Sequence, residues 1–432
     1  MNSKKKTINI VTLGCSKNLV DSEVLGGQLQ ANDIEVLHDQ NSLADVVIIN
    51  TCGFIFDAKQ ESIDVILQFA NEKKRGNLKK LIVMGCLSQR YKNDILKEIP
   101  EVDAFYGVDQ LEDIISDLGN KYYPLLNRKR DITTGHYAYL KIAEGCNRQC
   151  SFCAIPMIRG KHMSRERDEV LHEARQLVTQ GVKEIILISQ DLTYYGRESG
   201  KADRLSDLLE SIAGIEGLEW IRLHYAYPAA FPMDLLDVIA AHENVCNYLD
   251  IPFQHISEPI LKSMRRGVNK KQTIDLIEKI RHRIPGLALR TSLMVGYPGE
   301  TEKEFKELEE FVREIKFDRL GLFTYSHEEG TDAYNLNDDI PEKVKKDRMQ
   351  QLMDLQAGIS LQKNKEKINK VYKVIIDREE EDHFIGRTES DSPEVDNEVI
   401  ISKTVPYPGP GSFQLVRIVD ADIYDLTASL VK

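Results

Sequence analysis

The sequence predicts an α/β protein made of three consecutive parts. Short apolar runs alternate with helical patterns from residue 8 to residue 119, a second alternation starts at Tyr137, and five short β-type runs follow Val371. We therefore expect a parallel-sheet α/β domain over residues 7–120, an open barrel of six βα units over residues 132–363, and a small antiparallel β-barrel over residues 366–432.

In the first part, strands are expected at "INIVTL", "DVVIIN" and "KKLIVMGC", and helices at residues 20–31, 57–74 and 88–98. The stretch "KYYPLLNRKRDITTGH" then breaks the pattern and is interpreted as a linker. Six strands follow, and all but the last precede a helical pattern: "YAYLKIA", "KEIILIS", "EWIRLHY", "CNYLDIP", "LALRTSLMVG" and "FDRLGLFTYS". The Thr-x-x-Glu spacing at residues 301–304 predicts the start of a helix.

Composition excludes several classes of protein. The 432-residue chain is 42% apolar and 29% charged, which is typical of globular domains, and its formal charge of −12 lacks the basic footprint of a dedicated nucleic-acid binder. No apolar run reaches the roughly 20 residues of a membrane span, and "MNSKKKTINIVTLG" has no signal-peptide core. We expect a cytoplasmic protein without a membrane partner. In a reducing compartment, its seven cysteines indicate metal binding or catalysis.

Three of these cysteines lie in one short stretch, "EGCNRQCSFCAIP", at positions 146, 150 and 153. They follow the first barrel strand, at the end where barrel folds build active sites. A structural zinc site needs four ligands, which His136 or His162 would have to complete, and the spacing is unusual for zinc. An iron–sulfur cluster held by three cysteines keeps one iron open to another ligand. The stretch therefore favours an open cluster.

Three further cysteines each follow a predicted strand: Cys15 in "VTLGC", Cys52 in "VIINTC" and Cys86 in "LIVMGC". Loops at the carboxyl ends of parallel strands meet in one crevice, so these three are expected to converge. Each could alternatively be a small buried hydrophobe, which is a common fate of free cysteine. The core interpretation is preferred for Cys246, which lies inside the strand "VCNYLDIP" without a cysteine partner.

The motif "CNRQCSFC" resembles the Cys-x3-Cys-x2-Cys signature of the radical S-adenosylmethionine superfamily. Together with the dispersed trio before it and the β-rich tail behind it, the whole chain resembles the methylthiotransferase branch, whose members end in a TRAM domain. The resemblance implies two [4Fe-4S] clusters, one on Cys146, Cys150 and Cys153 that binds S-adenosylmethionine, and one on the dispersed trio. It also implies sulfur and methyl transfer to an unactivated carbon, with a flavodoxin or ferredoxin as electron donor.

Four more residues are candidates for binding S-adenosylmethionine. Phe152 lies between two cysteines and resembles the family's adenine-packing aromatic, with hydrophobic shielding of the cluster as the alternative. Gln190 and its neighbour Asp191 end the second barrel strand and resemble the family's Gln-Asp pair, although Leu192 departs from the threonine of some relatives. Arg290 could bind a carboxylate, or form an ion pair at the barrel rim. Gly296, in "GYPGE", permits either close approach to the cofactor or a simple turn. The "RRG" run at 265–267 is explained by the end of a helix.

Within the branch, "LGCSKNLVDSE" and "GRTESDSPEVDNEVII" resemble the enzymes that modify an aspartate β-carbon of small-subunit ribosomal protein S-twelve, rather than those that modify transfer-RNA adenosine. From Val371 to Lys432 there are six Lys and Arg against thirteen Asp and Glu, which disfavours phosphate and could steer a basic ribosomal protein. Ribosomal protein S-twelve is thus the expected partner, with the ribosome as a further candidate. A transfer-RNA enzyme and a non-catalytic iron–sulfur electron carrier are the alternatives.

Overall fold

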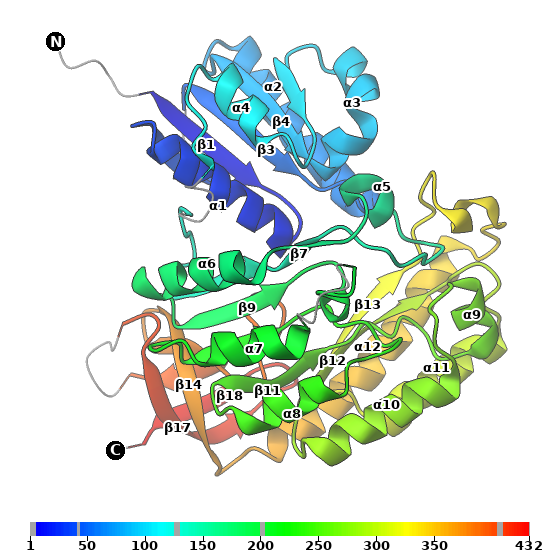
Figure 1. The fold of residues 1–432 in the computed structure, drawn as a ribbon. Helices are drawn as coiled ribbons and strands as arrows, with labels where there is room; N and C mark the ends of the chain where they lie inside the picture. The colour runs from blue at the N-terminus through cyan, green and yellow to red at the C-terminus, as the bar shows by residue number, and fades with distance from the viewer. Residues whose placement is uncertain (1–5, 41–43, 125–129, 199–203, 404–408, 432) are drawn as a thin grey trace. The chain divides into compact units, whose positions relative to one another are not determined.

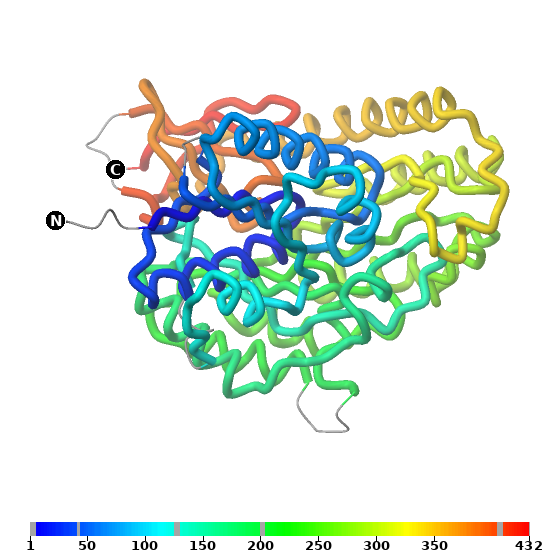
Figure 2. The backbone as a smooth tube through the Cα atoms, turned by 90° about the horizontal axis from the view of Figure 1, so that it is seen from above, coloured from blue at the N-terminus to red at the C-terminus, as the bar shows by residue number. Residues whose placement is uncertain are grey.

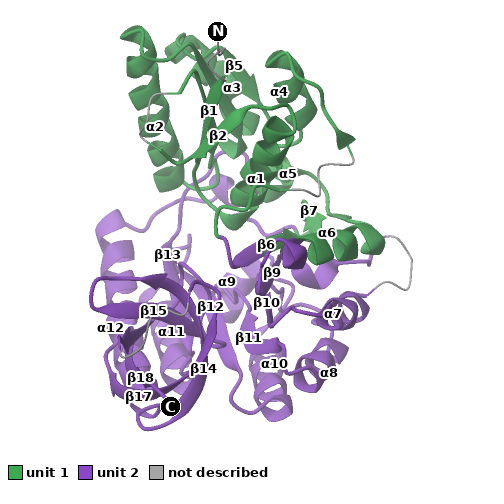
Figure 3. Ribbon diagram, turned by 90° about the vertical axis from the view of Figure 1, so that its left-hand side faces the viewer, with its two compact units in different colours: residues 1–134, 139–148, 153–176 green, residues 135–138, 149–152, 177–432 purple. Residues whose placement is uncertain are grey.

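The computed structural model describes residues 6–40, 44–124, 130–198, 204–403 and 409–431. The chain divides into two compact units (Figure 3). The first comprises residues 1–134, 139–148 and 153–176, and the second comprises residues 135–138, 149–152 and 177–432. The first unit thus takes in residues 132–134, 139–148 and 153–176, which the sequence prediction gave to the barrel domain, and the division into three domains stays a prediction. Within the described ranges, every helix is too short or too polar to span a lipid bilayer.

The first unit is built on a five-stranded parallel sheet (Figure 1). Its strands run in the order β2-β1-β3-β4-β5, with bounds β1 Thr7–Thr12, β2 Glu35–His38, β3 Val46–Thr51, β4 Lys80–Gly85 and β5 Ala104–Tyr106. Every residue of β3 is buried, as expected for a strand covered on both faces. The strand order reverses at β1, and this is the place where open α/β sheets form their ligand crevice.

Four helices cover the two faces of this sheet: α1 Ser16–Gln30, α2 Phe56–Lys74, α3 Cys86–Glu98 and α4 Leu111–Asp117. Helices α2 and α3 pack through Ile66 and Leu87 on one apolar cluster, and α1 and α4 pack through Leu25 and Ile114 on the other. The predicted strands and helices of this part are confirmed. The short strands β2 and β5 were not expected from the sequence.

A second, open sheet has six strands in the order β13-β12-β11-β10-β9-β6, and β9 to β13 belong to the second unit. All six predicted strands are present, with bounds β6 Tyr137–Lys141, β9 Glu184–Ile188, β10 Trp220–Leu223, β11 Val245–Asp250, β12 Ala288–Val295 and β13 Arg319–Thr324. The pairings between β9 and β13 are parallel, so the sheet is a partial barrel with β13 at one edge.

Helices connect these strands: α6 Arg167–Thr179, α7 Leu205–Ala213, α8 Asp234–Ala241, α9 Glu258–Ser263, α10 Lys270–Arg283 and α11 Glu302–Ile315. The predicted capping box is confirmed, because Thr301 accepts a hydrogen bond from the Lys303 amide and Glu304 bonds back to the Thr301 amide. Short elements complete this region: β7 Ala143–Glu144, β8 Met163–Ser164, α5 Ile155–Arg159, and 3-10 turns at Leu192–Tyr194 and Asp332–Asn335. The long helix α12, Glu342–Lys365, leads from the barrel to the carboxyl-terminal part (Figure 2).

The tail forms a closed barrel of five strands in the order β14-β15-β16-β18-β17. The strands are β14 Val371–Glu379, β15 His383–Thr388, β16 Val399–Ser402, β17 Phe413–Ala421 and β18 Leu426–Leu430. Its core is apolar and includes Val374, Phe384 and Ile418. The small barrel is confirmed, with one difference from the antiparallel prediction: β16 pairs with β18 in parallel.

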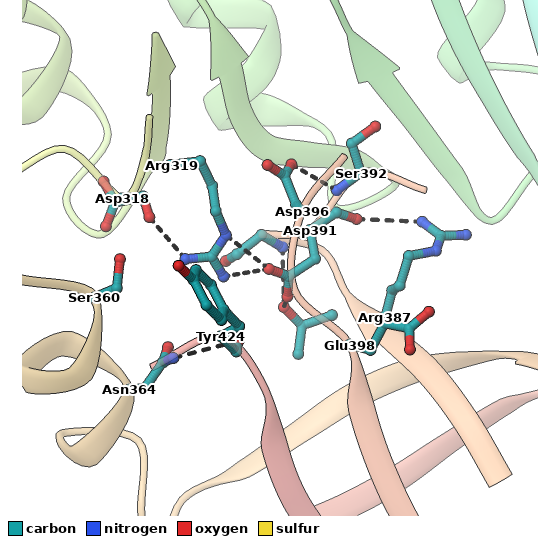
Figure 4. A network of polar contacts seen from close by, with 12 residues as sticks. Asp318, Arg319, Ser360, Asn364, Arg387, Asp391, Ser392, Asp396, Glu398 and Tyr424 are labelled. Atoms are coloured by element: carbon teal, nitrogen blue, oxygen red, sulfur yellow. Dashed lines mark hydrogen bonds and ion pairs between the residues drawn. The ribbon is translucent and has the colours of Figure 1, made fainter. Parts of the chain in front are cut away.

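The segment between β15 and β16 fills one end of the partial barrel. Residues 387–397, here called the plug segment, contact a residue of each of the six barrel strands, and Figure 4 shows the contact with Arg319 of β13. The contacts are Tyr137 with Glu394, Glu184 with Arg387, Arg222 with the Glu389 carbonyl, Tyr248 with Asp396, Arg290 with Asp396, and Arg319 with Asp391. Four of these barrel residues, Tyr137, Glu184, Arg290 and Arg319, lie in the first half of their strand, so the plug segment packs toward the amino-terminal end of the barrel.

These plug contacts correct one prediction from charge. Asp391 and Ser392 are buried at 1% and 0% exposure, so the acidic loop "DSPEVDN" does not present its first carboxylate to solvent. Burial alone would raise the pKa of Asp391, but the Arg319 guanidinium holds it below its usual value. Asp396 likewise contacts Arg290 and Tyr248. The sequence counted these carboxylates as surface charge, whereas their partners are basic and phenolic groups of the same chain.

Candidate functional site

The three dispersed cysteines lie together at the carboxyl edge of the first sheet. Cys15 immediately precedes α1, Cys52 follows β3, and Cys86 is the first residue of α3 directly after β4. Cys15 is exposed, whereas Cys52 and Cys86 are buried at 8% and 5% exposure. β1 and β3 flank the reversal in strand order, so the convergence follows from topology.

Glycines bring these loops into direct contact. A Cβ atom on Gly14, whose φ is +92°, would lie 2.6 Å from the Cβ of Cys52. A Cβ atom on Gly53 would lie 2.7 Å from the carbonyl carbon of Cys86. Any side chain at these two positions would therefore push the cysteine loops apart. The chain has placed glycine beside cysteine where the three loops meet.

Burial keeps two of these thiols protonated in the free protein. It raises the pKa of Cys52 to about 12, and the neighbouring Cys15 and Cys86 raise it further because charges of one sign repel. The pKa of Cys86 is also raised by burial, with Arg159 acting in the opposite direction. Thiolates are the form that binds metal, so loading such a site releases protons.

A buried arginine next to Cys86 was not anticipated from the sequence. Nη2 of Arg159 lies 3.6 Å from Sγ of Cys86 and 2.7 Å from Oδ1 of Asn18, and Nη1 lies 3.0 Å from both Asp21 and Glu144. Burial would lower the pKa of Arg159, but the two carboxylates raise it, so the guanidinium stays charged. A lone arginine at the end of the five-residue helix α5 carries no periodic signal that would have identified it.

In the part of the chain that the structure describes, no group of three His, Cys, Asp or Glu side chains is gathered tightly enough to hold a single metal ion. A cubane cluster needs a different arrangement, because each cysteine binds a different iron atom. The dispersed trio supplies three sulfur donors around a junction of loops, and it is chemically compatible with such a cluster.

The second trio lies in the loop between β7 and α5. Cys146, Cys150 and Cys153 are all partly exposed. The amide of Cys146 donates to the Gly160 carbonyl at 3.1 Å, and the amide of Arg148 donates to Sγ of Cys146 at 3.4 Å. His136, one proposed fourth zinc ligand, instead places Nε2 at 2.7 Å from Asp377. His162 has Nε2 at 3.3 Å from the Ser164 hydroxyl.

Cys150 has a charged neighbour that the sequence interpretation missed. Nη1 of Arg266 lies 3.2 Å from Sγ of Cys150, and the Tyr227 hydroxyl lies 3.4 Å from the same sulfur. Arg266 is only 4% exposed, and its guanidinium lies 4.3 Å from the centre of the Tyr227 ring. The helix-end explanation of "RRG" is therefore wrong for Arg266, because its side chain is directed to a cysteine rather than to the carbonyls of α9. The contact between Arg266 and Cys150 joins residues far apart in the sequence, so it could be found only from the fold.

Two cofactor candidates lie on the carboxyl side of the barrel strands. Phe152 packs against the apolar cluster of Ile260, Met264 and Tyr297, which is compatible with both of its predicted roles. Gly296 directly follows β12 with φ of +74°, and a Cβ atom there would lie 2.3 Å from Cγ of Lys345. The close approach at Gly296 is thus to a side chain of α12.

The remaining candidates have mixed positions. Gln190 follows β9 and is half-buried, and Asp191 accepts a hydrogen bond from Thr193 at 2.7 Å. Arg290 lies near the start of β12, 3.3 Å from Asp250 and 3.3 Å from Asp396. Its carboxylate partners belong to this chain, and the ion-pair alternative describes its contacts. Cys246 is a core residue as predicted, 1% exposed and packed with Trp220.

Comparison with known proteins agrees with this organisation. Residues 7–107 match the uncharacterized protein family UPF0004, residues 140–312 match the radical SAM superfamily, and residues 368–431 match the TRAM domain. The ribosomal protein uS12 methylthiotransferase RimO of Bacteroides thetaiotaomicron is 54% identical over 99% of this chain and 99% of the relative. The RimO of Cytophaga hutchinsonii is 52% identical over 100% of this chain and 99% of the relative. The chain belongs to the RimO family.

Solved structures match this RimO family member at the level of fold. The radical S-adenosylmethionine methyltransferase TsrM from Kitasatospora setae superposes with a TM-score of 0.54 at 14% identity, over 74% of this chain and 75% of that chain. The cobalamin-dependent S-adenosylmethionine radical enzyme OxsB gives 0.53 at 14% identity, over 82% and 56% of the two chains. The α/β architecture with an open barrel is therefore shared with radical SAM enzymes.

Proposed function

We propose that this chain methylthiolates ribosomal protein uS12 at the β-carbon of an aspartate. It would use two [4Fe-4S] clusters, one on Cys146, Cys150 and Cys153, and one on Cys15, Cys52 and Cys86. The observation that carries the proposal is the convergence of three strand-end cysteines through loops that only glycine can join. Relatives named as uS12 methylthiotransferases, more than half identical over nearly the full chain, support the substrate.

Bound at these cysteines, the clusters would supply the electron that cleaves S-adenosylmethionine to a radical, and the sulfur that is transferred. An unactivated C–H bond lies beyond side-chain acids and bases, so the chain itself has to bind, orient and exclude water. The six cysteines would hold both clusters as thiolates. Phe152, Gln190 and Gly296 are proposed to border S-adenosylmethionine. The contacts of Arg290 with Asp250 and Asp396 do not support a role for Arg290 in binding S-adenosylmethionine.

Two arginines donate hydrogen bonds to cysteine sulfurs in this arrangement. Arg266 donates to Sγ of Cys150 and Arg159 donates to Sγ of Cys86, so each trio has one cationic hydrogen-bond donor. Such donors stabilise negative charge on a ligand sulfur. The plug segment forms buried ion pairs with Glu184 of β9 and Arg319 of β13, and we propose that this packing limits the access of water to the barrel from that side.

The test is anaerobic reconstitution with iron and sulfide, followed by incubation with S-adenosylmethionine, a reductant and either uS12 or bulk transfer RNA. We expect the mass gain of a methylthio group on one aspartate of uS12. Modified transfer RNA with unchanged uS12 would reverse the assignment. A colourless protein after reconstitution would show that no iron–sulfur cluster is bound, and it would contradict the proposal. The natural electron donor, a flavodoxin or ferredoxin by family resemblance, stays a prediction.

A further inference from the structure

A pocket of about 170 Å³ lies beside β13, within the second unit. It is away from both cysteine trios in sequence. Most of its lining residues belong to β13, α12 and the plug segment, and Arg290 of β12 and Tyr424, between β17 and β18, complete the lining. The lining residues used below are Gly321 of β13, Met353 and Gln356 of α12, and Val395 and Asn397 near the end of the plug segment. No role proposed so far uses this pocket.

The strand that borders the pocket has a free edge. β13 is the last strand of the sheet and pairs with β12 alone. The amide of Asp318 donates to the carbonyl of Leu289, which lies near the start of β12. Along a strand, the backbone N–H and C=O groups of successive residues point alternately to its two sides. The N–H and C=O groups of Arg319, Gly321 and Phe323 therefore point away from β12. Among the described residues, none forms a backbone hydrogen bond with these outward groups.

Two buried side-chain amides beside the pocket each have one atom without a hydrogen-bond partner. Gln356 is 7% exposed, and its Nε2 donates to the Phe317 carbonyl and to Ser360, but its Oε1 has no hydrogen-bond partner. Asn397 is 8% exposed, and its Nδ2 has none either. Buried polar groups are normally bonded, and each orphan costs about 1–3 kcal/mol. Both residues, Gln356 and Asn397, line the pocket.

The rim of the pocket is apolar, and the two arginines that line it, Arg290 and Arg319, are paired with carboxylates of the same chain. Met353, Val395 and Tyr424 line the pocket and are 41%, 53% and 59% exposed. Figure 4 labels Tyr424 and Arg319, both of which line this pocket. Two neighbours in sequence, Asp354 and Asp422, are exposed carboxylates. Large exposed apolar side chains mark binding surfaces, and the acidic neighbours favour a basic partner.

We propose that the edge of β13 binds an extended, basic segment of the protein substrate, which adds a strand to the partial barrel. An extended peptide presents alternating donors and acceptors, and these match the outward groups of β13 together with Gln356 and Asn397. This inference rests on the proposed function, because it takes uS12 as the bound protein. Its site differs from the cluster sites, so substrate docking and chemistry are separable by mutation.

The decisive variant is Gly321→Pro. The Gly321 N–H points to the free edge, so proline removes one docking donor and blocks strand addition without removing a β12–β13 hydrogen bond. A Cβ atom at Gly321 has no neighbour closer than 3.5 Å, so the fold accepts it. Gly321→Ala is the matched control because it adds the Cβ atom and keeps the N–H. We expect the Kd for uS12, measured by fluorescence anisotropy, to rise about tenfold or more in Gly321→Pro and to change less than about twofold in Gly321→Ala.

Thermal denaturation shows whether Gly321→Pro is folded. If it is not folded, a second pair of variants tests the docking site. Met353 and Met233 are both 41% exposed, and only Met353 lines the pocket. Met353→Ala should weaken uS12 binding about fivefold, and Met233→Ala should leave it unchanged. Equal affinities across both pairs would overturn the docking site.

Four other results are informative. If the wild-type chain binds and modifies uS12 while Gly321→Pro binds it equally well, the docking inference fails and the proposed function stands. If the wild-type chain neither binds nor modifies uS12, the proposed function itself fails. If the wild-type chain forms a dimer in sedimentation and Gly321→Pro abolishes it, the strand edge binds a second copy of the chain, and the inference is overturned. The inference is also overturned if an RNA competes with uS12 for the wild-type chain and Gly321→Pro no longer binds that RNA.

Discussion

At the scale of single residues, the two trios are expected to separate by function. Cys150→Ala should abolish release of 5′-deoxyadenosine, because only its trio is proposed to bind S-adenosylmethionine. Cys52→Ala should retain part of that release and lose the methylthio product. Chromatography of 5′-deoxyadenosine and mass spectrometry of uS12 measure both. Full product from Cys52→Ala, or undiminished cleavage by Cys150→Ala, would contradict the division of labour.

The contact between Arg266 and Cys150 leads to a prediction about electron transfer. Hydrogen bonds to ligand sulfurs and nearby positive charge make an iron–sulfur centre easier to reduce. Arg266→Gln should therefore lower the midpoint potential of the reconstituted cluster in a redox titration followed by electron paramagnetic resonance. Arg265→Gln is the control, since Arg265 is exposed at 52% and pairs with Asp332. An equal shift in both variants would show that the contact has no specific effect.

At the scale of elements, the strand ends were predictable from the sequence and their partners were not. Continuous apolar runs identify buried parallel strands, so the position of Cys52 after "VIINT" was readable at once. β5 has three residues, too few for any periodicity, and it was missed. The ion pair of Asp391 with Arg319 joins residues 72 positions apart, and no local pattern encodes it. Charge counting therefore took the buried side chains of Asp391 and Asp396 for surface charge.

The plug predicts a large difference between buried and exposed ion pairs. Asp391 and Arg319 have side-chain exposures of 1% and 7%, whereas Glu219 and Lys373 have 45% and 46%. Asp391→Asn leaves a buried guanidinium without its counter-charge and should lower the free energy of unfolding by roughly 3–5 kcal/mol. Glu219→Gln should cost less than about 1 kcal/mol. Urea denaturation followed by Trp220 fluorescence compares them, and similar costs would argue against the plug as a stabilising element.

At the scale of the whole molecule, sequence reasoning succeeded where chemistry is tied to topology. Parallel strands bring their carboxyl ends to one edge, so three cysteines at equivalent strand ends had to converge, as Cys15, Cys52 and Cys86 do. It failed where a long side chain reaches across the fold. Arg159 and Arg266 contact cysteines 73 and 116 positions away, and their burial depends on packing that a single sequence does not display.

The buried carboxylates of the second unit also set how stability depends on pH. Burial would raise the pKa values of Glu184, Asp377 and Asp391, but all three lie below their usual values. Arginines lower the pKa values of Glu184 and Asp391, and the hydrogen bond with His136, followed by Arg387, lowers that of Asp377. A carboxyl whose pKa is lower in the folded state stabilises the fold above its unfolded pKa, here about 4, and this stabilisation is lost as the pH falls through the folded pKa. Asp250, whose pKa burial raises, acts in the opposite direction.

Because three groups outweigh one, the free energy of unfolding should be nearly constant from pH 7 to pH 5 and fall steeply below about pH 4. Urea titrations at a series of pH values measure this slope. Asp391→Asn removes one of the three lowered groups, so its acid slope should be shallower than that of the wild-type chain, while Glu219→Gln keeps the full slope. A variant Asp391→Asn with an unchanged slope would mean that this carboxylate is not charged in the folded protein, and the plug would then be held by neutral hydrogen bonds rather than by ion pairs.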